Sequence, residues 1–164
     1  MIRRSAVISD CLTWRYRLDR DLGIPGLVFA YLGVNGSTAD GDEEDHTTMK
    51  WNQFTLQNGG GRYITGNPYA YRAKDVRALA AAVDPIGPEN DRYIREILNE
   101  ADVIVPCWGS RGKLPKHLRP RLDTLRDWIF STKKPVKIFG LTASGDPKHP
   151  LMLPYSTQLI NWRL

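Results

Sequence analysis

Four short apolar runs, separated by helical patterns, constrain the fold of this chain more than any other feature. The first run, residues 26–34, is continuously apolar and bounded by glycine, which is typical of a strand buried on both faces. Residues 62–65, 102–107 and 135–141 give three further strands. The alternation predicts an α/β fold: a three-layer, four-stranded, mostly parallel sheet with helices on both faces.

Helical patterns and one strand-like alternation fill the rest of the chain. The expected helices begin near residue 45, at residue 74, near Pro88 and at about residue 115. Residues 5–22 alternate in polarity and predict an N-terminal antiparallel edge strand or hairpin. A length of 164 residues and a mass of 18.6 kDa predict one α/β domain, residues 1–164.

Positive charge is concentrated in one segment. The chain has a net charge of +5, yet residues 111–137 hold nine basic and two acidic residues, a net charge of +7 that leaves −2 elsewhere. Such a segment favours a polyanionic partner; the alternative is a solvated helix face. The acidic run at residues 40–45 lacks the ligand spacing of a calcium loop and predicts a mobile loop that enters a helix.

Several protein classes are excluded by what the sequence lacks. The longest apolar run is too short to span a bilayer and the N-terminus has no signal core, so we expect a cytoplasmic protein. Cys11 and Cys107 form no disulfide framework and predict two buried thiols. Phosphate-loop, dinucleotide and nucleophile-elbow motifs are missing, and the three histidines lack metal-ligand spacing. We therefore expect no cofactor and no metal.

Polar, glycine-bearing loops follow all four expected strands. They cover residues 33–40, 65–72, 107–111 and 141–150. Ligands of open α/β sheets bind beyond the carboxyl ends of the strands, so these loops predict a site at that edge.

Several motifs in these loops resemble a family of uncharacterised bacterial and phage proteins with the hallmark Asn-Pro-Ser-Thr-Ala-Asp. The motifs are Asn35-Gly-Ser-Thr-Ala-Asp40, Asn67-Pro-Tyr-Ala-Tyr-Arg-Ala-Lys-Asp75, Asp84-Pro-Ile-Gly-Pro-Glu-Asn-Asp91, Trp108-Gly109 and His149-Pro-Leu-Met-Leu-Pro154. The resemblance covers most of the chain and implies a domain of unknown function. The chain departs from the hallmark at Gly36, which stands in place of proline.

The order of motifs is also distantly similar to the uracil-DNA glycosylase superfamily. Gly33-Val-Asn35-Gly36 resembles the Gly-Ile-Asn-Pro motif of its mismatch-specific branch, and the strand ending at Trp108-Gly109-Ser110 resembles its Trp-Gly strand. His149-Pro150 resembles the start of its DNA-intercalating loop. The resemblance implies that Asn35 positions the attacking water and that His149 donates to the leaving base.

Strand-end placement and the resemblance together give the candidate binding residues. The residues expected to bind the base or substrate are Gly33, Gly36, Ser37, Asp40, Asn67, Tyr69, Tyr71, Arg72, Trp108 and Gly109. Those expected at the nucleic-acid backbone are Ser110, Arg111, Lys113, Lys116, Arg119, Arg121 and Lys148. The structural alternatives are that Asn35 holds a turn, that Trp108 belongs to the core and that His149 is an ordinary loop histidine.

These observations predict a DNA glycosylase-like enzyme that hydrolyses the N-glycosidic bond of a base in DNA or in a nucleotide. One alternative is a non-catalytic module that binds a nucleobase or nucleic acid, favoured by Gly36. Another is an enzyme that transfers a group to the base in the same pocket with water excluded. The expected partner is DNA or a nucleotide.

Overall fold

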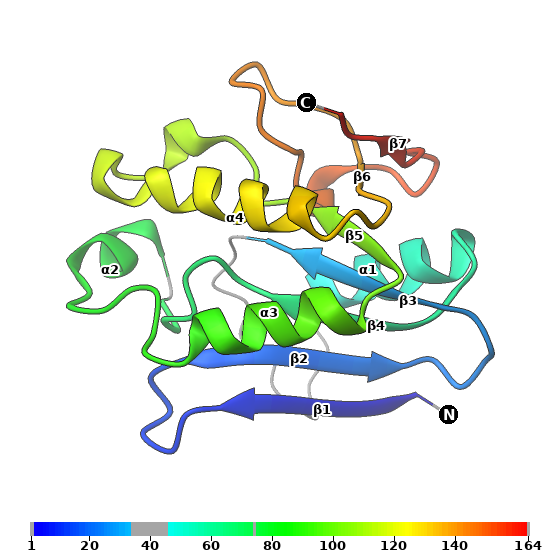
Figure 1. Ribbon diagram of the computed structural model, residues 1–164, viewed down its shortest axis with the longest axis horizontal. Helices are drawn as coiled ribbons and strands as arrows, with labels where there is room; N and C mark the ends of the chain where they lie inside the picture. Colours follow the sequence, from blue (N-terminus) through cyan, green and yellow to red (C-terminus); the bar gives the residue numbers. More distant parts are fainter. Residues whose placement is uncertain (1, 34–45, 74, 164) are drawn as a thin grey trace.

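The computed structural model describes residues 2–33, 46–73 and 75–163 (Figure 1). The strands are β1 (Arg3–Ile8), β2 (Arg15–Asp21), β3 (Leu27–Leu32), β4 (Gly60–Gly66), β5 (Val103–Pro106), β6 (Lys137–Ile138) and β7 (Ile160–Asn161). The α-helices are α1 (His46–Gln57), α2 (Val76–Ala81), α3 (Asn90–Glu100) and α4 (Pro120–Ser131). Short 3₁₀ helices are η1 (Arg111–Lys113), η2 (Lys116–Leu118) and η3 (Pro150–Met152).

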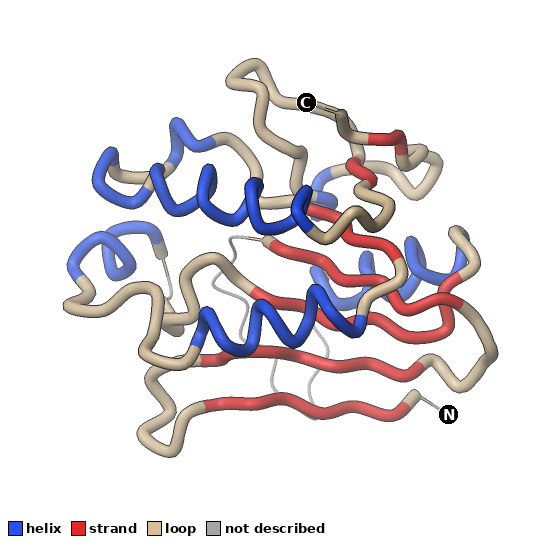
Figure 2. Tube along the Cα trace, in the orientation of Figure 1, coloured by secondary structure: helices blue, strands red, loops and turns tan. Residues whose placement is uncertain are grey.

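The central sheet is mixed and has five strands in the order β1-β2-β4-β3-β5 (Figure 2). Strand β3 lies between β4 and β5 and runs parallel to both. Strand β2 runs antiparallel to β4, and β1 runs antiparallel to β2. The α/β class and the N-terminal antiparallel hairpin are therefore confirmed.

The expected fourth parallel strand over residues 135–141 does not form as predicted. Strand β6 has two residues and pairs antiparallel with β7. Among the described residues, this segment pairs with β5 through one parallel bridge, between Ile104 and Val136. Pro135 has no N–H to extend a ladder, and Gly140, with a φ of 119°, turns the chain out of the strand conformation. The sheet consequently has three parallel strands rather than four.

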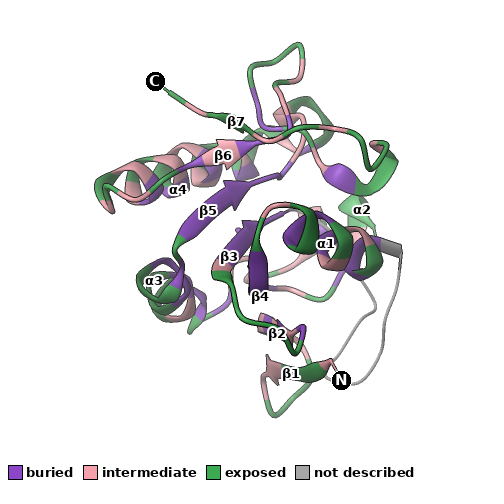
Figure 3. Ribbon diagram, turned by 90° about the vertical axis from the view of Figure 1, so that its right-hand side faces the viewer, coloured by how far each residue is buried: buried purple, intermediate pink, exposed green. Residues whose placement is uncertain are grey.

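Helices cover both faces of this sheet. The side chains of β3 point alternately to each face and pack against the helices there. Phe29 and Tyr31 pack in the cluster beneath α1, which also contains Trp51. Ala30 and Leu32 pack in the cluster beneath α3 and α4. Figure 3 shows α1 on one side of the strands and α3 and α4 on the other. Strand β3 is thus buried on both faces from Phe29 to Leu32, as the apolar composition of this part of the chain predicts.

The helical pattern over residues 115–130 forms two elements instead of one. Helix α4 begins at Pro120, which occupies its first turn, and η2 precedes it. A proline has no N–H to donate within a helix but fits the first turn, so the α-helix starts there.

Candidate functional site

The carboxyl ends of β3 and β5 meet directly. The N–H of Cys107 donates to the carbonyl of Leu32 at 2.8 Å. A Cβ at Gly33, the residue after β3, would lie 3.6 Å from Sγ of Cys107 and 3.6 Å from Cδ2 of His149. The structure therefore brings His149, from the loop before η3, against the end of β3.

The imidazole of His149 is neutral at neutral pH and has a defined tautomer. Burial, with a smaller contribution from the charge of Lys113, lowers the pKa of His149 from 6.5 to about 4. Its Nδ1 accepts a hydrogen bond from the N–H of Leu151 at 3.2 Å, so the ring proton is on Nε2. Nε2 is buried and has no hydrogen-bond partner among the residues that the structure describes. His149 thus carries a buried N–H that has no acceptor among the described residues.

An aromatic ring and an uncharged thiol lie near His149, on the side of the β3 end. The Trp51 ring lies 6.4 Å from the imidazole, centroid to centroid, at an angle of 57°. Burial raises the pKa of Cys107 to about 12, so its thiol stays protonated. Cys107 is buried as predicted, whereas the prediction for Cys11 is wrong because that residue is exposed.

A cavity of about 490 Å³ adjoins His149, a volume typical of small-molecule sites. Its lining comes from the loop after β5, from the loop over residues 142–148 and from η3. The lining residues are Trp108, Gly109, Ser110, Lys113, Thr142, Lys148, His149, Leu151, Met152 and Leu153. Cations line this cavity, and no carboxylate does among the described residues.

Asp146 joins two of the loops that line the cavity. Its buried carboxylate accepts hydrogen bonds from the N–H of Arg111 at 2.8 Å, from Nε of Arg111 at 3.1 Å and from Oγ of Ser144 at 2.7 Å. Burial by itself raises the pKa of Asp146, but these hydrogen bonds outweigh it and the pKa lies below its usual value. The N–H of Gly109 also donates to the carbonyl of Pro147 at 2.8 Å. The two loops are therefore held in one arrangement.

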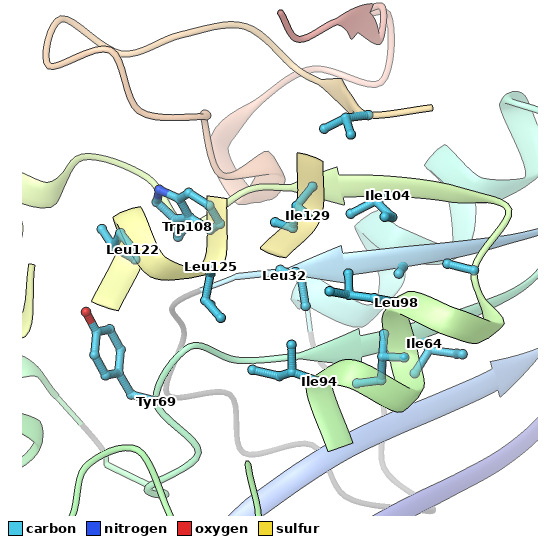
Figure 4. Packing of buried hydrophobic residues seen from close by; sticks show 14 of the residues in the cluster. Leu32, Ile64, Tyr69, Ile94, Leu98, Ile104, Trp108, Leu122, Leu125 and Ile129 are labelled. Carbon is cyan, nitrogen blue, oxygen red and sulfur yellow. The ribbon is translucent and has the colours of Figure 1, made fainter. Parts of the chain in front are cut away.

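The candidate side chains of the loop after β4 either make contacts within the fold or lie away from the cavity. Tyr69 is buried, its hydroxyl donates to the carbonyl of Leu118, and Figure 4 shows it among the core side chains. Oδ1 of Asn67 accepts from the N–H of Tyr69 at 2.8 Å. Tyr71 is half-buried against the core, and Arg72 is exposed. These four residues do not line the cavity beside His149, and the burial of Tyr69 does not fit a stacking surface for a base.

Most arginines of the basic segment bind the protein's own groups. The partners are Asp123 and Asp146 for Arg111, the carbonyl of Leu114 for Arg119, Asp91 and the carbonyl of Pro68 for Arg121, and Asp123 and Asp127 for Arg126. The side chain of Arg121 is only 8% exposed, so its position does not fit a phosphate contact. Lys113, Lys116 and Lys148 are exposed and form no ion pair within the described ranges. Of these, Lys113 and Lys148 line the cavity.

Comparison with protein-family models finds one match. The model of a protein of unknown function, DUF1643, matches residues 15–151. The chain belongs to the DUF1643 family. The expected membership in a family of unknown function is thereby confirmed. Searches of the curated proteins and of the solved structures find no match.

Four candidate residues of this DUF1643 protein, Asn35, Gly36, Ser37 and Asp40, lie outside the described residues, as does the acidic run at 40–45. In the part of the chain that the structure describes, no group of three or more acidic, His or Cys side chains could hold a metal. No described helix is long and apolar enough to cross a membrane.

Sequence reasoning missed Asp146 and the apolar end of the cavity at Leu151, Met152 and Leu153. A signal for Asp146 was present, because Thr142 and Ser144 surround it with hydroxyls in a glycine turn. Nothing in the sequence indicates that its partner is Arg111, which precedes it by 35 residues.

Proposed function

We propose that this protein hydrolyses the N-glycosidic bond between a base and its sugar, in DNA or in a nucleotide. One observation carries the proposal. His149 is neutral, its proton is on Nε2, and this buried N–H beside the end of β3 has no partner among the described residues. A buried donor without an acceptor is costly to a fold, which favours a role in binding a ligand.

The proposed reaction needs such a donor. The bond from C1′ to the base nitrogen breaks with its electron pair moving to the base, and the oxygen of a water molecule bonds to C1′. The attacking water loses one proton, and this positive charge balances the negative charge of the departing base. An imidazole N–H aimed at an oxygen of that base stabilises its negative charge without transferring its own proton.

The water-positioning role is assigned to Asn35 by the resemblance to the uracil-DNA glycosylase superfamily. Asn35 follows Gly33 by two residues, and the Gly33 position contacts His149. A central set of parallel strands with helices on both faces is compatible with the layout of that superfamily. An amide can orient a water molecule without acting as a strong base.

A second candidate function is base recognition without hydrolysis. It is favoured by the cavity lining, which includes no carboxylate among the described residues that would activate water. Gly36 in place of the family's proline favours it too.

Mass spectrometry of released bases tests the proposal. The purified protein is incubated with nucleotides and with single- and double-stranded oligonucleotides that contain normal, deaminated and modified bases. We expect release of one base by the wild type, a loss of about 100-fold or more in His149→Ala and in Asn35→Ala, and wild-type release in His117→Ala, whose side chain is exposed. Equal release by His149→Ala would contradict the assignment. Binding without any release would establish the second candidate.

A further inference from the structure

Two lysines of the cavity point to a second part of the ligand. We propose that Lys113 and Lys148 bind the phosphate of a nucleoside phosphate whose base enters the cavity beside His149. The identity of the base rests on the proposed function, but the phosphate site does not.

The positive charges of Lys113 and Lys148 are available to bind an anion. Lys113 and Lys148 line the cavity, are exposed and form no ion pair within the described part of the chain. Lys134, by contrast, donates to three carbonyls at the end of α3, at 2.6 to 2.7 Å. Arg111 and Arg121 are held by carboxylates, whereas Lys113 and Lys148 are the cations in the cavity lining. A doubly charged anion is the ligand that such a pair attracts.

The fold holds the backbone of both lysines in place. Lys113 ends η1 and Lys148 follows Pro147, and these two loops are joined through Asp146. The side chain of Lys148 extends across Gly140, with Cδ, Cε and Nζ at 3.6, 3.8 and 3.9 Å from where a Cβ would be. The stem of Lys148 is therefore partly ordered before a ligand binds, which lowers the entropic cost of binding.

Both lysines share the cavity with His149. The charge of Lys113 contributes to lowering the pKa of His149, and Lys113, Lys148 and His149 line the same cavity. A phosphate between them would lie near the base donor, as the base and phosphate of one nucleotide do. Hydroxyls contribute little, because those of Ser110 and Thr142 are hydrogen-bonded to Ser144.

Binding measurements with matched ligands test the inference. The five common deoxynucleoside 5′-monophosphates, their nucleosides and a mixed-sequence single strand are titrated into the wild type and into Lys113→Gln/Lys148→Gln. Lys133→Gln, an exposed lysine beyond the end of α4, is the control. We expect a phosphate-bearing ligand to bind at least 10-fold more tightly than its nucleoside, and this advantage to disappear in the double variant and persist in the control.

Inorganic phosphate separates this inference from the proposed function. Its addition, followed by NMR, is expected to shift the backbone amides of Lys113 and Lys148 in the wild type and to leave the double variant unchanged. No shift in the wild type, or an equal shift in the double variant, would overturn the phosphate site. Phosphate binding without base release would support the site and contradict hydrolysis. Tighter binding of the strand than of the mononucleotide would identify a polynucleotide as the source of the phosphate.

Discussion

At the scale of single residues, the protonation state and the tautomer of His149 follow from the groups around its imidazole. The imidazole lies within van der Waals range of the Gly33 position at the end of β3, and its Nε2 is buried. Burial favours the uncharged ring, and the charge of Lys113 favours it further. The hydrogen bond from Leu151 to Nδ1 then selects the tautomer with a proton on Nε2.

The lowered pKa of His149 predicts a specific pH dependence of stability. Between pH 6.5 and about 4 the unfolded chain binds a proton at His149 that the folded protein does not, so the free energy of unfolding falls as the pH falls through this range. At pH 4.5 the loss from this group is about 2 to 3 kcal/mol. Urea unfolding at pH 6.5 and pH 4.5 measures it, and we expect His149→Gln to lack this part of the loss while His117→Gln retains it. An identical pH dependence in wild type and His149→Gln would contradict the burial of a neutral ring.

Asp146 gives a second prediction at this scale. Asp146→Ala leaves the N–H of Arg111 and the hydroxyl of Ser144 without their acceptor, in a place where Asp146 is 2% exposed. We expect the free energy of unfolding to fall by about 2 to 4 kcal/mol. Asp127→Ala, at a side chain that is 70% exposed and paired with Arg126, should cost less than about 0.5 kcal/mol. Chemical denaturation measures both, and equal costs would show that Asp146 does not hold the loops.

At the scale of elements, the start of β4 depends on two glycines for different reasons. A Cβ at Gly61 would lie 2.2 Å from the carbonyl oxygen of Ile24, which is backbone that cannot move aside. Gly59 has a φ of 83° and nothing within 4 Å of a Cβ. The first position is limited by space and the second by backbone conformation.

Alanine substitutions separate these two reasons. Gly59→Ala should cost about 1 to 2 kcal/mol, because an L residue is strained at positive φ. Gly61→Ala should cost more, about 3 kcal/mol, because the strand must shift away from the preceding loop. Thermal and urea unfolding of both variants give the values. A Gly61→Ala protein as stable as Gly59→Ala would show that this contact is readily relieved.

The elements also show what the sequence can predict. Strands β3 and β5 and helices α1 and α3 follow from local patterns of apolar residues, whereas the helix expected from about residue 115 begins at Pro120. The fourth parallel strand could not be excluded, because its replacement by β6 depends on pairing with Ile160 and Asn161, far along the chain. Local patterns report burial and periodicity, and they do not report the partner of a strand.

At the scale of the whole molecule, the candidate cavity lies at the edge of the sheet where the sequence predicted a site, and its lining differs from the predicted one. The rule for parallel sheets placed it beyond the strand ends, and His149 lies there. The roles expected for Tyr69 and Arg121 depended on exposure, which their distant partners, Leu118 and Asp91, remove. Residue type and spacing do not reveal such long-range contacts.

The order of the sheet predicts how stability is distributed over the molecule. Strand β3 is paired on both sides and buried, whereas β1 is an edge strand with an exposed beginning. Native-state hydrogen exchange should therefore be slowest in β3 and fastest in β1 among the strands of the five-stranded sheet. Faster exchange in β3 than in β1 would contradict this order of pairing.

We propose that His149 presents a neutral Nε2–H to a nucleobase at the end of the parallel strands. Nitrogen-15 NMR of the imidazole rings, with the five deoxynucleoside 5′-monophosphates added in turn, tests it most directly. We expect a protonated Nε2 and an unprotonated Nδ1 at pH 7. Addition of a nucleotide should shift the Nε2 resonance of His149 and leave the resonances of the exposed His117 unchanged. A charged ring, the opposite tautomer, or an Nε2 that responds to none of the nucleotides would contradict it.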